Sequence, residues 1–322
     1  LLFALPSAIA IAAETAERAR DLGIPFIGQP GPLNAITDVA GVEVGQVTLI
    51  RGDGKLEVGK GPVRTGVTTI HPRGKDSTDP VFAGWFTLNA SGELTGTTWL
   101  EERGLVDGPI SITNTHSVGV VRDASVAWMV SKGWPADWHA PVAGETYDGA
   151  LNDINGFHVQ PEHALQAMQT ASAGPVEEGA VGGGTGMVCN GFKGGIGTAS
   201  RVVRTLGREF TVGVLVQCNY NWGGADLRLG GRPVSERLPV GEHCFTDRSI
   251  ERHVNWYPYC DELGAERSGK TPDGSIIIVV ATDAPLSDRN LERLAKRAFL
   301  GIARVGGFAS NGSGDYVIAF SN

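Results

Sequence analysis

The hydrophobic residues of this chain follow two periods, one typical of strands and one typical of helices. Short runs of apolar and β-branched residues lie between glycine-rich turns, as expected of β-strands. The run Ser-Ile-Ile-Ile-Val-Val-Ala at residues 275–281 is apolar without alternation, which predicts a strand buried on both faces. The predicted strands are residues 42–47, 63–70, 79–88, 108–113, 210–217, 275–281 and 316–320.

Helical spacing is clearest at residues 287–304. Apolar residues recur there at intervals of three and four, at Leu291, Leu294, Ala295, Ala298, Phe299 and Ile302. Ser287 is placed to cap the start of this helix, and the glycines at 306 and 307 are placed to end it. Two further helices are predicted at residues 117–130 and 161–171. Because strands and helices alternate along the chain, we predict layered sheets with helices on the outside.

The chain changes in character between residues 229 and 272. This segment is polar, rich in turn-forming residues and without a sustained period, and it ends shortly before the strand predicted at 275–281. A long irregular segment inside a domain is usually functional or mobile. We therefore predict a single domain over residues 30–322 that contains a linker or insert at 229–272.

Composition narrows the class of protein. Hydrophobic residues make up 41% of the 322 residues, which is too much for a disordered chain, and the 46 glycines follow no G-X-Y period, which excludes collagen. The formal net charge of −8 argues against nucleic acid, because proteins that bind it usually present a basic face. Glycine at this density predicts many tight turns and close backbone contacts.

The chain begins with an apolar run, LLFALPSAIAIAA, that ends in small residues. Small residues at alternate positions resemble a signal-peptidase site, so we interpret residues 1–13 as part of a signal peptide; the alternative is a short buried helix. The run is too short to span a membrane and no other uncharged stretch is long enough, so no membrane partner is expected. The expected location is periplasmic or secreted, and cytoplasmic if the run is a buried helix.

The cysteines and histidines form no recognisable metal-binding motif. No cysteine pair is spaced C-x-x-C and the seven histidines are scattered, so no metal site is predicted. Cys244 and Cys260 lie in the polar segment and are candidates for a disulfide in an oxidising compartment, with Cys189 and Cys218 as buried free thiols. The sequence does not decide among the pairings.

Glycines are densest between residues 179 and 201, in GAVGGGTGMVCNGFKGGIGTASR. The nucleotide-binding patterns G-x-G-x-x-G and G-x-x-x-x-G-K-[ST] are both absent. Residues 186–193 come near the second pattern, but Phe192 stands where it needs glycine before lysine. The cluster therefore favours tight turns over a phosphate site.

The junction of Gly274 and Ser275 allows two interpretations. A Pro-Asp-Gly turn into a buried strand explains it structurally. It also has the parts of a self-cleaving bond, namely a polar linker, a small residue, and a hydroxyl that opens a rigid strand. Cleavage would give Ser275 a free α-amine, which titrates near neutrality and can act as a base toward the Ser275 hydroxyl.

Five segments spread over residues 30–322 carry a family resemblance. They are ITDVAGVEVGQVTL (36–49), GGGTGMVCNGFKGGIGTASR (182–201), VGVLVQCNY (212–220), DGSIIIVVATDAPL (273–286) and NGSGDYVIAFS (311–321). Together they resemble the β-aminopeptidase family, which includes L-aminopeptidase D-amidase/D-esterases and β-peptidyl aminopeptidases and is related in fold to ornithine acetyltransferases. The resemblance implies an α/β fold, an αββα four-layer sandwich of the autoprocessed N-terminal-nucleophile type. It places cleavage between an α chain ending at Gly274 and a β chain starting at the nucleophile Ser275.

The same resemblance assigns further site residues one by one. Asn219 matches the amide that stabilises the oxyanion, and Tyr147 matches a tyrosine beside the reacting carbonyl. Glu145 resembles the acid that binds the N-terminal ammonium of the substrate. Ser313 and Asp315 resemble the pair that orients the nucleophile and its amine, although some relatives have glutamate in place of the shorter Asp315.

Taken singly, these side chains also have structural explanations. Asn219 is compatible with a turn at the end of a strand, Tyr147 with a surface aromatic, and Asp315 with a Gly-Asp turn. The matches occur in order along the chain, and this order favours the site interpretation.

The resemblance implies a function as well as a fold. It implies an autoprocessing serine aminopeptidase that hydrolyses amides or esters of short peptides or amino-acid derivatives with a free amino terminus, α-L, D or β-amino, through an acyl-enzyme on Ser275. It implies no metal or organic cofactor, and a homo-oligomer of processed αβ heterodimers. Two alternatives stay open: an acyltransferase of the ornithine acetyltransferase kind, whose members use threonine where this chain has Ser275, and a noncatalytic ligand-binding protein.

Overall fold

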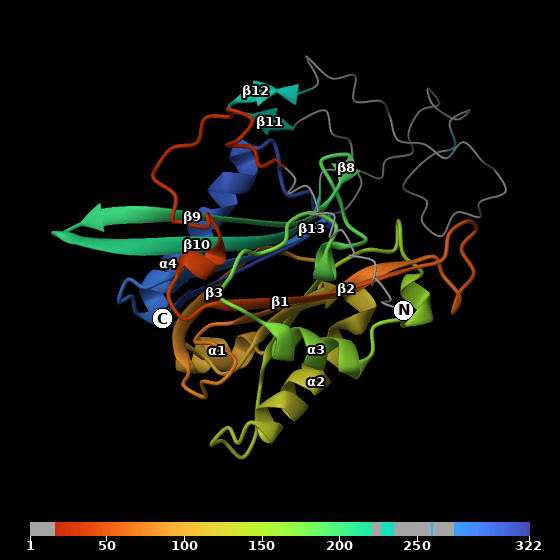
Figure 1. Cartoon of the computed structure of the whole chain (residues 1–322), viewed down its shortest axis with the longest axis horizontal. Coiled ribbons are helices and arrows are strands. Elements are labelled where there is room, and N and C mark those ends of the chain that lie inside the picture. Colours follow the sequence, from red (N-terminus) through yellow and green to blue (C-terminus); the bar gives the residue numbers. More distant parts are fainter. Residues whose placement is uncertain (1–16, 221–226, 235–258, 260–273) are drawn as a thin grey trace, which may run out of the picture.

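The computed structural model describes residues 17–220, 227–234, 259 and 274–322, drawn in colour in Figure 1. Three predictions from the sequence lie wholly or mostly outside these residues. They are the signal segment at 1–13, the pairing of Cys244 with Cys260, and most of the insert at 229–272.

The larger of two stacked sheets contains the strand predicted to be buried on both faces. Its six strands lie in the order β4 (Leu105–Val106), β3 (Val81–Ala90), β14 (Gly314–Ser321), β13 (Ser275–Thr282), β10 (Arg208–Asn219) and β9 (Gly195–Thr205). Every residue of β13 is buried, which confirms the prediction. β13 pairs in parallel with β14 and antiparallel with β10.

The smaller sheet has four strands and packs face to face on the larger one. Its order is β1 (Glu43–Arg51), β2 (Val63–His71), β5 (Ile110–Asn114) and β6 (Val142–Thr146). Ile112 of this sheet and Ile277 of the larger sheet belong to one buried core between them. The helices α2 (Val118–Ser131) and α3 (Pro161–Thr170) cover the outer face of the smaller sheet through a second apolar cluster (Figure 1).

The helix α4 (Asp288–Arg304) covers the outer face of the larger sheet. Its apolar stripe is buried as the spacing predicts, at Leu291, Ala295, Phe299 and Ile302. α4 lies so close to β3 that a Cβ atom on Gly84 would be 2.4 Å from the backbone nitrogen of Glu292. Ser287 precedes the helix, but its side chain makes no capping hydrogen bond, contrary to the expected cap. The layers run helix, sheet, sheet, helix, which confirms the predicted αββα sandwich.

All of the predicted strands and helices form within a few residues of the expected bounds, but some elements were not predicted. β6, β9 and the helix α1 (Thr97–Arg103) are among them. β9 begins inside the glycine cluster at residues 179–201, which the sequence assigned to tight turns, and continues beyond it. That assignment holds for the turn η4 (Gly182–Gly184) and is wrong for β9. Glycines and small residues give β9 a weak local signal, and its pairing with β10 makes it a strand.

The remaining elements are short. They are the 3-10 turns η1 (Ile36–Asp38), η2 (Thr115–Ser117) and η3 (Ile154–Gly156), the hairpin of β7 (Val188–Cys189) with β8 (Phe192–Lys193), and the hairpin of β11 (Arg228–Leu229) with β12 (Arg232–Pro233). The β11–β12 hairpin occupies the start of the predicted insert. Among the described residues, no helix is both long and apolar enough to cross a membrane.

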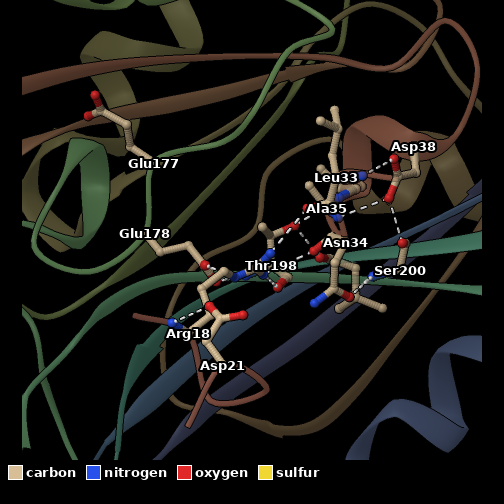
Figure 2. Close-up of polar contacts among 12 residues, drawn as sticks. Arg18, Asp21, Leu33, Asn34, Ala35, Asp38, Glu177, Glu178, Thr198 and Ser200 are labelled. Carbon is tan, nitrogen blue, oxygen red and sulfur yellow. Dashed lines mark hydrogen bonds and ion pairs between the residues drawn. The ribbon is translucent and has the colours of Figure 1, made fainter. Parts of the chain in front are cut away.

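Residues 18–38 cover β9, one of the two edge strands of the larger sheet (Figure 2). Arg18 forms an ion pair with Glu178 at 2.6 Å, and its guanidinium donates to the backbone carbonyls of Leu33, Asn34 and Thr198. Asp38 accepts a hydrogen bond from the Ser200 hydroxyl at 2.6 Å, and from two backbone N–H groups of its own segment. An edge strand that is covered in this way is less available for pairing with another chain.

Buried His71 makes stability depend on pH. Its ring packs near Trp128, its Nε2 lies 3.1 Å from the carbonyl oxygen of Met168, and burial lowers the pKa of His71 to about 4. In the unfolded chain the imidazole of His71 takes up a proton near pH 6.5, whereas in the folded chain it does so only near pH 4. The contribution of neutral His71 to the free energy of unfolding is therefore complete above pH 6.5 and is lost as the pH falls toward 4, by about 3 kcal/mol at most. Thermal unfolding at several pH values should show that the melting temperature falls less steeply between about pH 6.5 and 4 in His71→Phe than in wild type. Equal slopes would contradict this account.

Candidate active site

Ser275 lies at the start of β13, where the two sheets are in contact. It pairs with Asn219 on the antiparallel neighbour β10 and with Gly314 on the parallel neighbour β14. Its side chain is buried, and its Oγ accepts a hydrogen bond from the backbone N–H of Tyr147 at 3.3 Å. A hydroxyl of the larger sheet therefore meets the segment that follows β6 of the smaller sheet.

Gly274 is enclosed by backbone atoms of the neighbouring strands. Its carbonyl oxygen accepts a hydrogen bond from the N–H of Gly314 at 3.0 Å. A Cβ atom at residue 274 would lie 2.6 Å from the Cα atom of Tyr220 and 2.9 Å from the carbonyl oxygen of Asn219. These distances are too short for a real Cβ contact, so glycine is the residue that fits. The need for a small residue before Ser275 thus has a steric cause.

Asn219 ends β10 and presents its amide on the face of the sheet that carries the Ser275 hydroxyl. Since paired residues of adjacent strands point to the same face, their Cβ atoms lie about 5 Å apart. The Oδ1 of Asn219 accepts a hydrogen bond from the N–H of Val188 at 2.9 Å. Its Nδ2 is buried and has no hydrogen-bond partner in the described part of the chain. A buried donor of this kind is unusual and is available to an atom that a ligand brings.

Glu145 and Tyr147 come from β6 and the residues just after it. Glu145 is buried; its Oε2 accepts the Thr115 hydroxyl at 2.5 Å and its Oε1 accepts the N–H of Glu93 at 3.1 Å. Burial raises the pKa of the Glu145 carboxyl, so the charged form gains from a cation that enters its surroundings. Burial also raises the pKa of Tyr147, which keeps its phenol protonated at neutral pH.

Ser313 and Asp315 form a hydrogen-bonded pair beside the Gly274–Ser275 bond. The Ser313 hydroxyl lies 2.6 Å from the Oδ2 of Asp315, and the Nδ2 of Asn89 donates to both side chains. Burial raises the pKa of Asp315.

Asp315 nevertheless faces away from the Ser275 hydroxyl. It pairs with Ile276, which packs toward α4, so its carboxylate lies on the opposite face of the sheet. The hydrogen bonds of that carboxylate go to Ser313 and Asn89 rather than to Ser275. The link from this pair to the cleavage junction runs through the backbone of Gly314, which bonds the Gly274 carbonyl.

Two residues close to the site were not predicted from the sequence. Asn89, at the end of β3, joins the Ser313–Asp315 pair, and Asp148 directly follows Tyr147. Asp148 is completely buried, and burial raises its pKa to about 7. Hydrogen bonds to its carboxylate favour the charged form and lower the pKa, but the effect of burial is larger. Its Oδ1 accepts the side-chain amide of Asn152 at 3.0 Å, which anchors the segment that reaches Ser275. The sequence signal for Asp148 was its place in the motif GETYDG.

Cys189 and Cys218 form a disulfide, so the prediction that both are buried free thiols is wrong. They lie 29 residues apart in the sequence, and their Cα atoms are 5.7 Å apart in the fold. The pairing depends on β7 folding back against the end of β10, which no local pattern indicates. Among the described residues, no cluster of three or more histidine, cysteine, aspartate or glutamate side chains is arranged to hold a metal ion.

Comparison with known proteins places this geometry in a family. The sequence model of Peptidase family S58 matches residues 34–322. The chain belongs to peptidase family S58. It is 61% identical over 94% of its length to Beta-peptidyl aminopeptidase BapA of Sphingosinicella microcystinivorans, covering 74% of that protein. It is 46% identical over its whole length to the BapA of Sphingosinicella xenopeptidilytica, covering 78% of that protein.

Solved structures of similar sequence share the fold of this S58 chain. L-aminopeptidase D-Ala-esterase/amidase of Ochrobactrum anthropi, described as a variant of the Ntn hydrolase fold, superposes with a TM-score of 0.80 at 45% identity, over 94% of this chain and 78% of that one. The beta-aminopeptidase of a Burkholderia species gives a TM-score of 0.79 at 46% identity, over 95% and 77%. The predicted family, the N-terminal-nucleophile fold and the aminopeptidase class are thereby confirmed. This S58 chain is a hydrolase that acts as an aminopeptidase.

Proposed function

We propose that the chain cleaves itself between Gly274 and Ser275 and then works as a serine aminopeptidase with Ser275 as its N-terminal nucleophile. The observation that carries this proposal is the buried Nδ2 of Asn219, which has no hydrogen-bond partner among the described residues and lies on the strand position that pairs with Ser275. A second donor, the N–H of Tyr147, already bonds the Ser275 Oγ. A hydroxyl with amide donors beside it is the arrangement that acyl transfer needs.

Self-cleavage begins as an acyl shift at the junction. The Ser275 Oγ attacks the carbonyl carbon of Gly274, the bond from that carbon to the Ser275 nitrogen breaks, and the hydroxyl proton passes to the nitrogen. Water then hydrolyses the resulting ester, which leaves a carboxylate on Gly274 and a free hydroxyl and α-amine on Ser275. The tight enclosure of Gly274 and the bond from Gly314 to its carbonyl support this step, because they hold the carbonyl in place.

Turnover uses the same hydroxyl. The α-amine of Ser275 accepts the hydroxyl proton as Oγ attacks the substrate carbonyl, and it returns the proton to the leaving amine. The Nδ2 of Asn219 donates to the oxyanion that forms in this step. Water then hydrolyses the acyl-enzyme and regenerates the free serine.

The substrates we propose are short peptides, amides or esters with a free amino terminus. Glu145 supports this choice, because a buried carboxylate with lone pairs to spare favours an ammonium ion. The names of the two BapA relatives support placing β-amino acyl groups first among the substrates. A panel of α-L, D and β-amino p-nitroanilides measures this preference, and failure on every β-amino member would contradict it.

Wild-type protein tests the proposal directly. After expression we expect two bands on a denaturing gel, with Ser275 as the amino-terminal residue of the smaller one by Edman sequencing. Activity on the p-nitroanilide panel should appear in step with cleavage, since the α-amine that serves as base exists only afterwards. Wild type that stays uncut and inactive after prolonged incubation would overturn the proposed function.

A further inference from the structure

The Cys189–Cys218 disulfide brackets the hydrogen bond that orients Asn219. Cys218 immediately precedes Asn219 at the end of β10. Cys189 immediately follows Val188, whose N–H donates to the Oδ1 of Asn219. The covalent link therefore joins the residue beside the donor to the residue beside the acceptor of this one hydrogen bond.

Further backbone contacts hold the β7–β8 hairpin onto the same strand end. The N–H of Asn190 donates to the carbonyl oxygen of Tyr220 at 2.8 Å. Gly194 packs so closely that a Cβ atom there would lie 2.8 Å from the carbonyl oxygen of Cys218 and 2.9 Å from the nitrogen of Cys189. The disulfide thus closes a small unit, formed by residues 187–194 and the end of β10.

The direction of the Asn219 amide matters for the proposed chemistry. An amide rotated by half a turn would point its oxygen toward the reacting carbonyl and would repel the developing oxyanion. The hydrogen bond from Val188 opposes this rotation, because the Val188 N–H can donate to the Oδ1 of the amide but not to its Nδ2, which is itself a donor. Donors that are fixed before the reaction contribute most to stabilising the oxyanion.

We propose that the Cys189–Cys218 disulfide is a positioning element of the oxyanion site, which keeps the Val188 N–H against Asn219 and the Nδ2 of Asn219 directed at the substrate carbonyl. This inference rests on the proposed function. The side chains of the two cysteines do not touch the substrate, because Cys218 points to the α4 face of the sheet while Asn219 points to the other face. They act through the hairpin backbone.

The first test compares wild type with the double variant Cys189→Ser/Cys218→Ser. Mass spectrometry of non-reduced tryptic peptides should first find residues 189 and 218 linked in wild type. Active sites are titrated with a serine-reactive acylating probe, so that kcat is expressed per active site. We expect this kcat to fall about tenfold, which is less than the loss expected when an oxyanion donor is removed altogether, and KM to change less than about twofold. The matched control Cys244→Ser/Cys260→Ser removes the same number of cysteines and should keep the wild-type kcat.

A purely structural disulfide gives a different result. It would lower the melting temperature and the titrated fraction of active enzyme while leaving kcat per active site unchanged, and this outcome would overturn the inference. So would the absence of the 189–218 link in wild type. If the Cys189→Ser/Cys218→Ser variant does not fold, folded wild type treated with a phosphine reductant takes its place. The Cys244→Ser/Cys260→Ser variant is treated with the reductant in parallel, so that reduction of residues 244 and 260 does not contribute to the result.

A double-mutant cycle locates the effect. In processed Asn219→Ala protein, removal of the disulfide should lower kcat no further, because the amide that it orients is gone. A second tenfold loss in that background would show that the effect does not run through Asn219. Inactive, uncut wild type would instead sink the proposed function, so failure of the inference and failure of the function remain distinguishable.

Discussion

Replacing Ser275 with alanine is expected to leave the chain as one uncut polypeptide without aminopeptidase activity. The variant keeps the pairing of β13 with β10 and β14 but lacks the hydroxyl that is proposed to attack Gly274 and then the substrate. Loss of a catalytic nucleophile typically lowers kcat by about 10⁴-fold or more. A denaturing gel and p-nitroanilide hydrolysis, both run beside wild type, measure the two effects.

The matched control is Ser275→Cys, because a thiol of similar size can also attack a carbonyl carbon. We expect this variant to be cut slowly and to keep measurable activity. Circular dichroism should show that the alanine and cysteine variants share the same fold. An alanine variant that is cut before residue 275, or that keeps more than about one per cent of wild-type activity, would remove Ser275 from the role of nucleophile.

Replacing Asn219 with alanine should lower kcat by about 10²- to 10³-fold with a small change in KM. The buried Nδ2 of Asn219 has no hydrogen-bond partner in the described part of the chain. Its removal therefore destabilises the transition state, in which negative charge develops on the substrate oxygen, more than the bound substrate. Steady-state kinetics on the processed fraction, normalised by active-site titration, separates kcat from KM. A rise in KM alone would assign the amide to substrate binding.

Asn219→Asp provides the conservative comparison. A carboxylate still accepts the hydrogen bond from Val188, and its shape matches the amide, but it cannot donate and it carries negative charge. We therefore expect it to be at least as inactive as the alanine variant, and its melting temperature to be lowered as well, because the introduced charge is buried without a cationic partner among the described residues. Near-normal kcat in Asn219→Asp at a pH high enough to ionise the introduced carboxyl would exclude an oxyanion role for this side chain.

The layered fold was readable from the sequence because its main elements carry strong local signals. The β-branched run of β13 and the apolar stripe of α4 are periodic, and periodicity is a property of neighbouring residues. β9 was missed because glycine gives no such signal, and its state depends on pairing with β10. The motif around Gly274 and Ser275 was visible for a related reason, since its residues are contiguous.

The candidate site divides in the same way. Ser275, Asn219, Tyr147 and Glu145 were proposed from motifs, and the fold brings their strands together at the contact of the two sheets. The roles of these residues and of the Ser313–Asp315 pair remain predictions. Asn89 and Asp148 take part in the surroundings of the site without forming a motif of their own.

By itself, the sequence determined the alternation of strands and helices, the family, and the glycine–serine junction proposed for cleavage. Tertiary structure alone decided which face Asp315 occupies, which cysteine pairs with Cys218, and which N–H holds the Asn219 amide. The physical reason is separation along the chain. Local spacing fixes the conformation of a segment, whereas the orientation of a side chain at a strand end depends on the segments that pack against it from elsewhere in the chain.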